Sequence, residues 1–134
     1  MIVEKQINTI GLVWTQQINQ TKDYWIHDIL ITPSGRMFIA YEADGDNVRY
    51  SDDNGETWTK CTDTEYVEKL CITKTGRILA IINEASGYLG YSDDNGATWN
   101  ITWSPYNAGA QDSIADLYIL STGRLLMSVV ASGI

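Results

Sequence analysis

The sequence predicts an all-β fold made of repeated antiparallel units. Two separate motifs recur along the chain, and both recur with the same offset. Apolar residues form short runs bounded by Gly, Asn and Asp, and no longer stretch shows a helical stripe. The composition agrees, because eight Tyr and five Trp among 134 residues favour strands, and eleven Gly favour turns. We therefore expect strands and tight turns along the whole chain.

The first repeated motif is a turn that precedes an apolar run. It reads ITPSGR at 31–36, ITKTGR at 72–77 and ILSTGR at 119–124. Its glycine and small polar residues are typical of a tight turn between two strands. Arg36, Arg77 and Arg124 occupy the same place in their copies. We therefore expect each arginine to serve its own unit rather than to join the others around an anionic ligand.

The second repeated motif is a longer polar turn that ends in tryptophan. It reads YSDDNGETW at 50–58 and YSDDNGATW at 91–99, so both motifs recur after 41 residues. Two independent motifs with one offset indicate a true repeat. A degenerate copy precedes them, in which Gly11 and Trp14 align with Gly55 and Trp58 after a shift of 44. Its polar half is lost.

Repeats of this length, with four short strands each, predict blades of a β-propeller. Segments 24–62 and 65–103 each supply a blade of four strands, A to D. Segment 1–18 supplies half a blade (C–D), and segment 112–134 supplies the other half (A–B). The expected strands are 25–32, 36–42, 47–51, 57–62, 66–73, 77–83, 87–92, 98–103, 114–120 and 124–131. Residues 1–134 thus form one propeller domain, or a segment of one, with about three blades' worth of strands.

Three blades are too few to close a ring, since propellers have at least four. The two half blades are complementary, because one has strands A and B and the other has C and D. Two copies could therefore close a six-bladed ring as a homo-oligomer, without free sheet edges. The rival hypothesis is that the sequence is a segment of a longer chain.

The polar turn resembles the Asp-box, or bacterial neuraminidase repeat, of sialidase-like propellers. Two copies are complete, at Ser51, Asp53, Gly55, Thr57 and Trp58 and at Ser92, Asp94, Gly96, Thr98 and Trp99. In such a turn Ser and Asp side chains bond backbone N–H groups, Gly adopts a positive φ, and Trp packs on the sheet. We interpret both boxes as folding elements. A calcium ion at the paired Asp residues is the less favoured alternative, because such sites need more converging oxygens.

The resemblance also implies where a ligand would bind. In these propellers the site lies opposite the Asp-boxes, at the loops that join strand D to A and strand B to C. The candidate ligand-binding residues near that end are Tyr24, Trp25, His27, Asp28, Asp44, Tyr66, Glu68, Tyr106 and Asp112. Aromatic rings with acids suit a sugar, which stacks and shares hydrogen bonds. Ordinary loop composition and a solvated channel remain the alternative interpretation.

The enzymes of this family use an arginine triad, a Tyr–Glu pair and an acidic Asp, with an Arg-Ile-Pro motif before the first box. This chain lacks Arg-Ile-Pro, and three of its four arginines are fixed in the repeat. We therefore carry over no catalytic residue and expect no cofactor. The favoured function is a non-catalytic module that recognises a glycan or a protein, for example in adhesion or on a virion surface. The alternatives are a fragment of a sialidase or related glycoside hydrolase and a structural assembly protein.

Composition excludes several other partners. The net charge of −8 opposes nucleic acid and anionic membrane surfaces. No apolar run reaches the roughly 20 residues of a membrane span, and the N-terminus lacks the pattern of a signal peptide. The single histidine, His27, gives no metal-binding set, so we expect no metal site. Cys61 and Cys71 are expected on an outer and an inner strand, too far apart for a disulfide.

Overall fold

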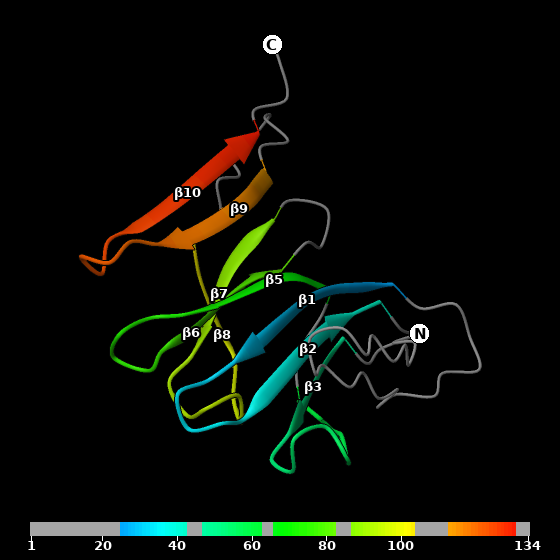
Figure 1. Cartoon of the computed structure of the whole chain (residues 1–134). Coiled ribbons are helices and arrows are strands. Elements are labelled where there is room, and N and C mark those ends of the chain that lie inside the picture. The colour runs from blue at the N-terminus through cyan, green and yellow to red at the C-terminus, as the bar shows by residue number, and fades with distance from the viewer. Residues whose placement is uncertain (1–24, 43–46, 63–65, 83–86, 104–112, 131–134) are drawn as a thin grey trace, which may run out of the picture.

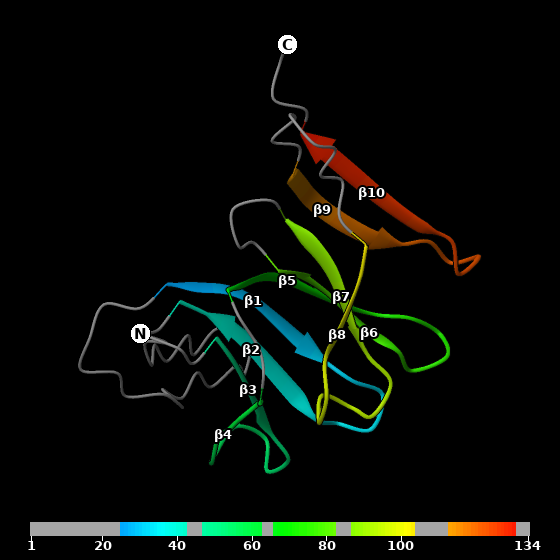
Figure 2. The same cartoon turned by 180° about the vertical axis from the view of Figure 1, so that it is seen from behind.

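The computed structural model describes residues 25–42, 47–62, 66–82, 87–103 and 113–130, and Figures 1 and 2 show it from two sides. Within these ranges the chain forms ten strands and no helix. Every strand pair is antiparallel. The predicted all-β class is therefore confirmed. Closure of the sheets into a ring stays a prediction.

The strands form two four-stranded sheets and one hairpin. The first sheet has the order β1 (Ile26–Ile31), β2 (Met37–Tyr41), β3 (Val48–Ser51) and β4 (Thr59–Lys60). The second has the order β5 (Val67–Ile72), β6 (Ile78–Ile82), β7 (Tyr88–Ser92) and β8 (Asn100–Trp103). The hairpin pairs β9 (Ser113–Ile119) with β10 (Leu125–Val130). Each strand end lies within two residues of its expected position. Segment 1–18 lies outside the described residues, and so does the half blade expected there.

The hydrophobic core lies between the sheets. Strands β1, β5 and β9 run side by side, so the second sheet stands between the first sheet and the hairpin (Figure 1). One cluster joins the first two sheets and includes Phe38 and Val48 with Leu70 and Ile78. Another cluster joins the second sheet to the hairpin and includes Ile81 with Ile114 and Leu117. Strand β6 is apolar at every position because both of its faces are covered.

The two polar turns that resemble Asp-boxes are called Asp-box turns below, and the first is held by its own side chains. The Ser51 hydroxyl donates to Asp53 at 2.7 Å and accepts the Gly55 N–H at 2.8 Å. Asp53 also accepts the Thr57 N–H at 2.8 Å. Asn54 and Gly55 both have positive φ, 58° and 90°, which turns the chain back into the next strand. The Trp58 indole donates to the Gly55 carbonyl at 3.0 Å.

The second Asp-box turn repeats this network. Ser92 bonds Asp94 and the Gly96 N–H, and Asp94 accepts the Thr98 N–H at 2.8 Å. Trp99 is half-buried against the cluster between the first two sheets. Its indole nitrogen is buried and has no hydrogen-bond acceptor among the described residues. The two boxes therefore have the same turn network. They differ in that the Trp58 indole N–H has an acceptor and the Trp99 indole N–H has none among the described residues.

The second Asp-box turn also fastens the second sheet to the first. Arg36 donates to the Asn95 carbonyl at 2.9 Å, and Thr62 donates to the Ala97 carbonyl at 3.2 Å. A Cβ atom at Gly96 would lie 2.4 Å from the Phe38 ring, so the absence of a side chain permits this close approach. The turn thus links two units as well as two strands.

The repeated arginines each bind an aspartate of their own sheet. Arg36 donates twice to Asp52, at 2.7 Å in both bonds, and its guanidinium lies 4.2 Å from the Tyr50 ring centroid. Arg77 repeats the pair with Asp93, at 2.7 and 2.8 Å. These bidentate bonds join the two turns at one end of each sheet. They engage both carboxylate oxygens of Asp52 and of Asp93 with an arginine.

Both cysteines are free thiols. Cys61 is buried in the cluster between the first two sheets. Cys71 packs against the other cluster, and burial raises the pKa of its thiol to about 11. A thiol with this pKa stays protonated at neutral pH and is a poor nucleophile.

Gly96→Ala is expected to destabilise the fold more than Gly76→Ala. Both substitutions impose a side chain on a positive φ, 87° and 89°, but only the Cβ at position 96 would meet the Phe38 ring. Backbone strain costs about 1–2 kcal/mol, and the clash should add about 1–3 kcal/mol for Gly96→Ala alone. Urea denaturation of the two variants measures the difference. Equal losses would contradict the close approach.

Acid is expected to weaken the Asp-box turns. Bonds from Thr57 and Ser51 lower the pKa of Asp53 from 3.8 to about 2, and bonds from Thr98 and Ser92 do the same for Asp94. A carboxylate whose pKa is lower in the folded state stabilises the fold at pH values above its unfolded-state pKa. This stabilisation is lost as the carboxylate becomes protonated. The free energy of unfolding should therefore fall between about pH 4 and pH 2.

Asp53→Asn should flatten this dependence, since an amide does not titrate. Glu56→Gln is the matched control, because Glu56 lies in the same turn and its side chain makes no hydrogen bond among the described residues. Denaturation curves at several pH values provide the measurement. An unchanged pH slope in Asp53→Asn would show that the bonds do not shift the titration.

Candidate functional site

A β-bulge interrupts the first strand of each unit near the same end. In β1 the bulge leaves His27 without a cross-strand partner, because Ile26 pairs with Tyr41 and Asp28 with Ala40. Glu68 has the same place in β5, and Ala115 has it in β9. A bulge redirects side chains away from the regular pleat, and such irregularities often lie next to binding sites.

The bulge of β1 brings His27 into contact with the second sheet. The rings of His27 and Tyr66 lie 5.5 Å apart at an angle of 55°. His27 Nε2 lies 3.9 Å from a Glu42 oxygen, which is beyond hydrogen-bond distance. This nitrogen is buried and lacks a hydrogen-bond partner among the described residues. His27, Glu42 and Tyr66 therefore form a compact group that spans the first two sheets.

Tyr66 shares this environment with two carboxylates. Burial raises the pKa of its phenol, and the nearby charges of Glu42 and Glu68 raise it further. The Tyr66 hydroxyl also bonds Glu42. A phenol with a raised pKa stays protonated at neutral pH, so it can donate a hydrogen bond but is not primed as a nucleophile.

Trp25 completes the arrangement at the edge of the first sheet. Its side chain is 73% exposed, although it adjoins β1, and its carbonyl accepts the Glu42 N–H at 2.9 Å. An exposed indole is a suitable platform for a sugar ring or an apolar side chain. We call Trp25, His27, Glu42, Tyr66 and Glu68 the loop-end cluster.

Asp28 binds backbone N–H groups of the sheets and is not a member of the loop-end cluster. One of its oxygens accepts the N–H of Ile29, and the other accepts the N–H of Leu70 in the second sheet at 2.8 Å. Its counterpart Asp116 bonds the Leu117 N–H and lies 3.5 Å from Lys69. The innermost strands are therefore joined by polar bonds at the level of the bulges. Asp28 lies beside the loop-end cluster but has its acceptors engaged.

The structure thus brings together three of the predicted ligand-binding residues, His27, Tyr66 and Glu68, with Trp25 at the same end. Tyr24, Asp44, Tyr106 and Asp112 lie outside the described residues. Sequence reasoning missed Glu42, which it placed at the end of an expected strand. Its position directly before the expected loop 43–46 was the signal that could have identified it.

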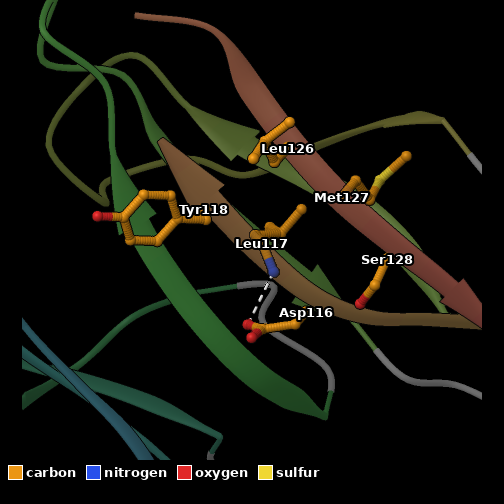
Figure 3. Close-up of a pocket in the computed structure, with 6 residues that line it drawn as sticks. All are labelled: Asp116, Leu117, Tyr118, Leu126, Met127 and Ser128. Carbon is orange, nitrogen blue, oxygen red and sulfur yellow. Dashed lines mark hydrogen bonds between the residues drawn. The ribbon is translucent and has the colours of Figure 1, made fainter. Parts of the chain in front are cut away.

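A separate hollow of about 330 Å³ lies on the hairpin (Figure 3). Its lining residues come from β9 and β10 and are Asp116, Leu117, Tyr118, Leu126, Met127 and Ser128. The hollow is more apolar than polar, and the hydrogen bond between Asp116 and the Leu117 N–H lies within it. None of the predicted ligand-binding residues lines it.

In the described ranges, no three side chains among His, Cys, Asp and Glu gather in a way that could hold a metal ion. No helix in these ranges has the length and hydropathy needed to cross a membrane.

Comparison with known proteins supports the fold alone. No family model matches the chain, and no curated protein matches it. Among solved structures, the chain is similar to a protein of unknown function from Dyadobacter fermentans DSM 18053, with a TM-score of 0.55 and 16% identity. The match covers 78% of this chain but only 43% of the other. At this identity the chain shares an all-β arrangement with a longer protein.

Proposed function

We propose that this chain is a non-catalytic recognition module that binds a glycan or a protein at the loop-end cluster. The observation that carries the proposal is the contact between His27 and Tyr66 across two sheets, with Glu42 beside both. The cluster offers an exposed indole ring at Trp25 and carboxylate acceptors at Glu42 and Glu68. This combination stacks on a ligand and bonds its hydroxyl groups, which suits a carbohydrate.

The charge of the site favours a neutral ligand. Glu42 and Glu68 both lie close enough to raise the pKa of Tyr66, and the chain carries a net charge of −8. An acidic sugar such as a sialoside would be repelled by this field. A neutral, hydroxyl-rich glycan would bond the carboxylates without that cost.

A propeller would supply the architecture for this proposal. Two four-stranded antiparallel units side by side, a further hairpin and paired Asp-box turns are what a row of blades would show. In such a ring the loop-end cluster would lie at the mouth of the central channel, on the face away from the Asp-boxes. We further propose that two copies close a six-bladed ring.

A structural assembly role is the second candidate function. It is favoured by the exposed apolar side chains of β1 and β10, which include Ile31, Leu126 and Val130. Assembly and recognition are compatible, since neither Ile31 of β1 nor any residue of β10 belongs to the loop-end cluster.

Wild-type protein is expected to bind neutral glycans on an array and to leave a fluorogenic sialoside intact. Turnover of the sialoside would overturn the proposal in favour of a glycoside hydrolase. Absence of binding to both glycans and proteins would overturn it in favour of pure assembly.

Trp25→Ala should weaken ligand binding about tenfold or more, because aromatic anchors dominate such sites. Ile101→Ala is the matched control, since Ile101 is also a large exposed side chain but lies on the outer strand β8. Titration calorimetry with a glycan identified on the array provides the measurement. Equal effects of both substitutions would place the site elsewhere.

A further inference from the structure

Two consecutive residues of β1 both contact the second sheet. The His27 ring lies 5.5 Å from the Tyr66 ring, and an Asp28 oxygen accepts the Leu70 N–H at 2.8 Å. Successive side chains of a regular strand point to opposite faces, so neighbours in such a strand would not both reach one adjoining sheet. The β-bulge between Ile26 and Asp28 removes this restriction. The contact between His27 and Tyr66 therefore depends on the bulge.

The Asp28 carboxylate connects this bulge to the second sheet. Its Oδ1 accepts the N–H of Ile29, the next residue of β1, at 2.9 Å. Its Oδ2 accepts the Leu70 N–H of β5. Each oxygen is bonded to the backbone of a different strand, and a carboxylate forms strong bonds with such donors. The carboxylate thus sets the position of the bulge relative to the second sheet.

The Leu70 N–H is a donor that needs an acceptor from outside its own sheet. Strand β5 lies at the end of the strand order and pairs only with β6 among the described residues. Leu70 is buried in the cluster between the first two sheets. A backbone N–H without an acceptor in such a place costs free energy. Asp28 supplies the acceptor, so the bond is favoured by β5 as well as by β1.

The junction between the second sheet and the hairpin is connected differently. Lys69 has the place of Asp28 after the bulge of β5, and a lysine side chain cannot accept an N–H bond. Its ammonium group lies 3.5 Å from Asp116 of β9, and the two side chains are 40% and 63% exposed. An exposed ion pair holds its partners weakly. The tighter connection, from carboxylate to backbone, lies at the junction where His27 meets Tyr66.

We propose that Asp28 is a positioning residue of the recognition site. It acts through His27: by bonding the Leu70 N–H it holds the bulge in place and keeps the His27 ring against Tyr66. Binding sites need their side chains held within roughly 0.5 Å of the productive geometry. Side chains from two sheets meet this need only when the sheets do not shift relative to each other. The proposal rests on the binding function proposed above for the loop-end cluster.

The single histidine of the chain makes the contact measurable by NMR, because the His27 ring signals have no counterpart from another histidine. Tyr66→Leu removes the facing ring and gives the reference positions of these signals when the contact is lost. Asp28→Asn keeps the size of the side chain but leaves one oxygen acceptor for two N–H groups. We expect Asp28→Asn to move the His27 signals toward the reference positions.

Asp116→Asn is the matched control. Asp116 has the same place after its bulge and accepts the Leu117 N–H at 2.8 Å, but it belongs to the hairpin. Both substitutions remove one negative charge, so an effect of net charge would appear in both variants. The control should leave the His27 signals in place. Equal displacement in both variants would overturn the positioning role.

A role of Asp28 in stability alone gives a different result. It would lower the resistance to urea without moving the His27 signals of the folded protein, so unmoved signals in folded Asp28→Asn would also overturn the proposal. If Asp28→Asn does not fold, Asp28→Glu replaces it. That variant keeps the charge and both oxygens but displaces them by one methylene group, and the same shift of the His27 signals is expected.

The clamp is also open to a test in the wild-type protein. The Leu70 amide proton should exchange slowly with solvent although β5 pairs on one side only among the described residues. Exchange as fast as that of an unprotected amide would overturn the bond to Asp28, and the positioning role with it.

Glycan affinity provides the functional readout. Asp28→Asn should weaken binding of the neutral glycan identified on the array about tenfold, and Asp116→Asn should leave the affinity unchanged. Wild-type affinity in Asp28→Asn would overturn the positioning role. Absence of glycan binding by the wild-type protein would instead count against the proposed function, and the His27 signals, which need no ligand, would still decide whether Asp28 positions the ring.

Discussion

A four-stranded sheet has two faces, and a sheet of this chain buries a face by packing it against a neighbouring unit. Both hydrophobic clusters of the described residues join one unit to the next. The second sheet is covered on both sides, so β6 is apolar throughout. The first sheet and the hairpin keep apolar side chains exposed, and Ile31 and Tyr118 are among them. The stacking of units is therefore the constraint from which the pattern of burial follows.

The polar turns make this stacking specific. Apolar packing alone is tolerant of sliding, because it is not directional. The Arg36 bond to the Asn95 carbonyl and the Asp28 bond to the Leu70 N–H each connect one particular residue of the first sheet to one of the second. The two bonds lie at opposite ends of the sheets. Together they fix the position of one sheet, along the direction of its strands, relative to the next sheet.

The repeat allowed the strands to be predicted closely, because each motif locates a turn and each turn bounds two strands. The turn bonds of Ser51 and Asp53 were also predictable, since small polar side chains in a tight turn have few other donors within reach. The Arg36–Asp52 pair was not predicted. The expected strand order places the two turns at one end of the sheet, but it does not show that the Arg36 and Asp52 side chains meet there.

The candidate site was predictable only in part, for a different reason. His27 and Tyr66 belong to separate units, and their contact depends on a β-bulge that no sequence pattern predicted. Glu42 follows an apolar run and was assigned to a strand, so the sequence did not predict that it lies close to His27. Contacts within a unit follow from the repeat. Contacts between units depend on how the innermost strands depart from regular pairing.

The β-bulge in the first strand of each unit affects which amino-acid substitutions the chain can accept. The bulged residue is left out of the cross-strand pairing, so its side chain does not have to match a partner. Three different residues, His27, Glu68 and Ala115, occupy this place in the three units. One unit could therefore acquire a new binding residue there while the sheets keep their register. Ligand preference could be altered by single substitutions, one unit at a time, at little risk to folding.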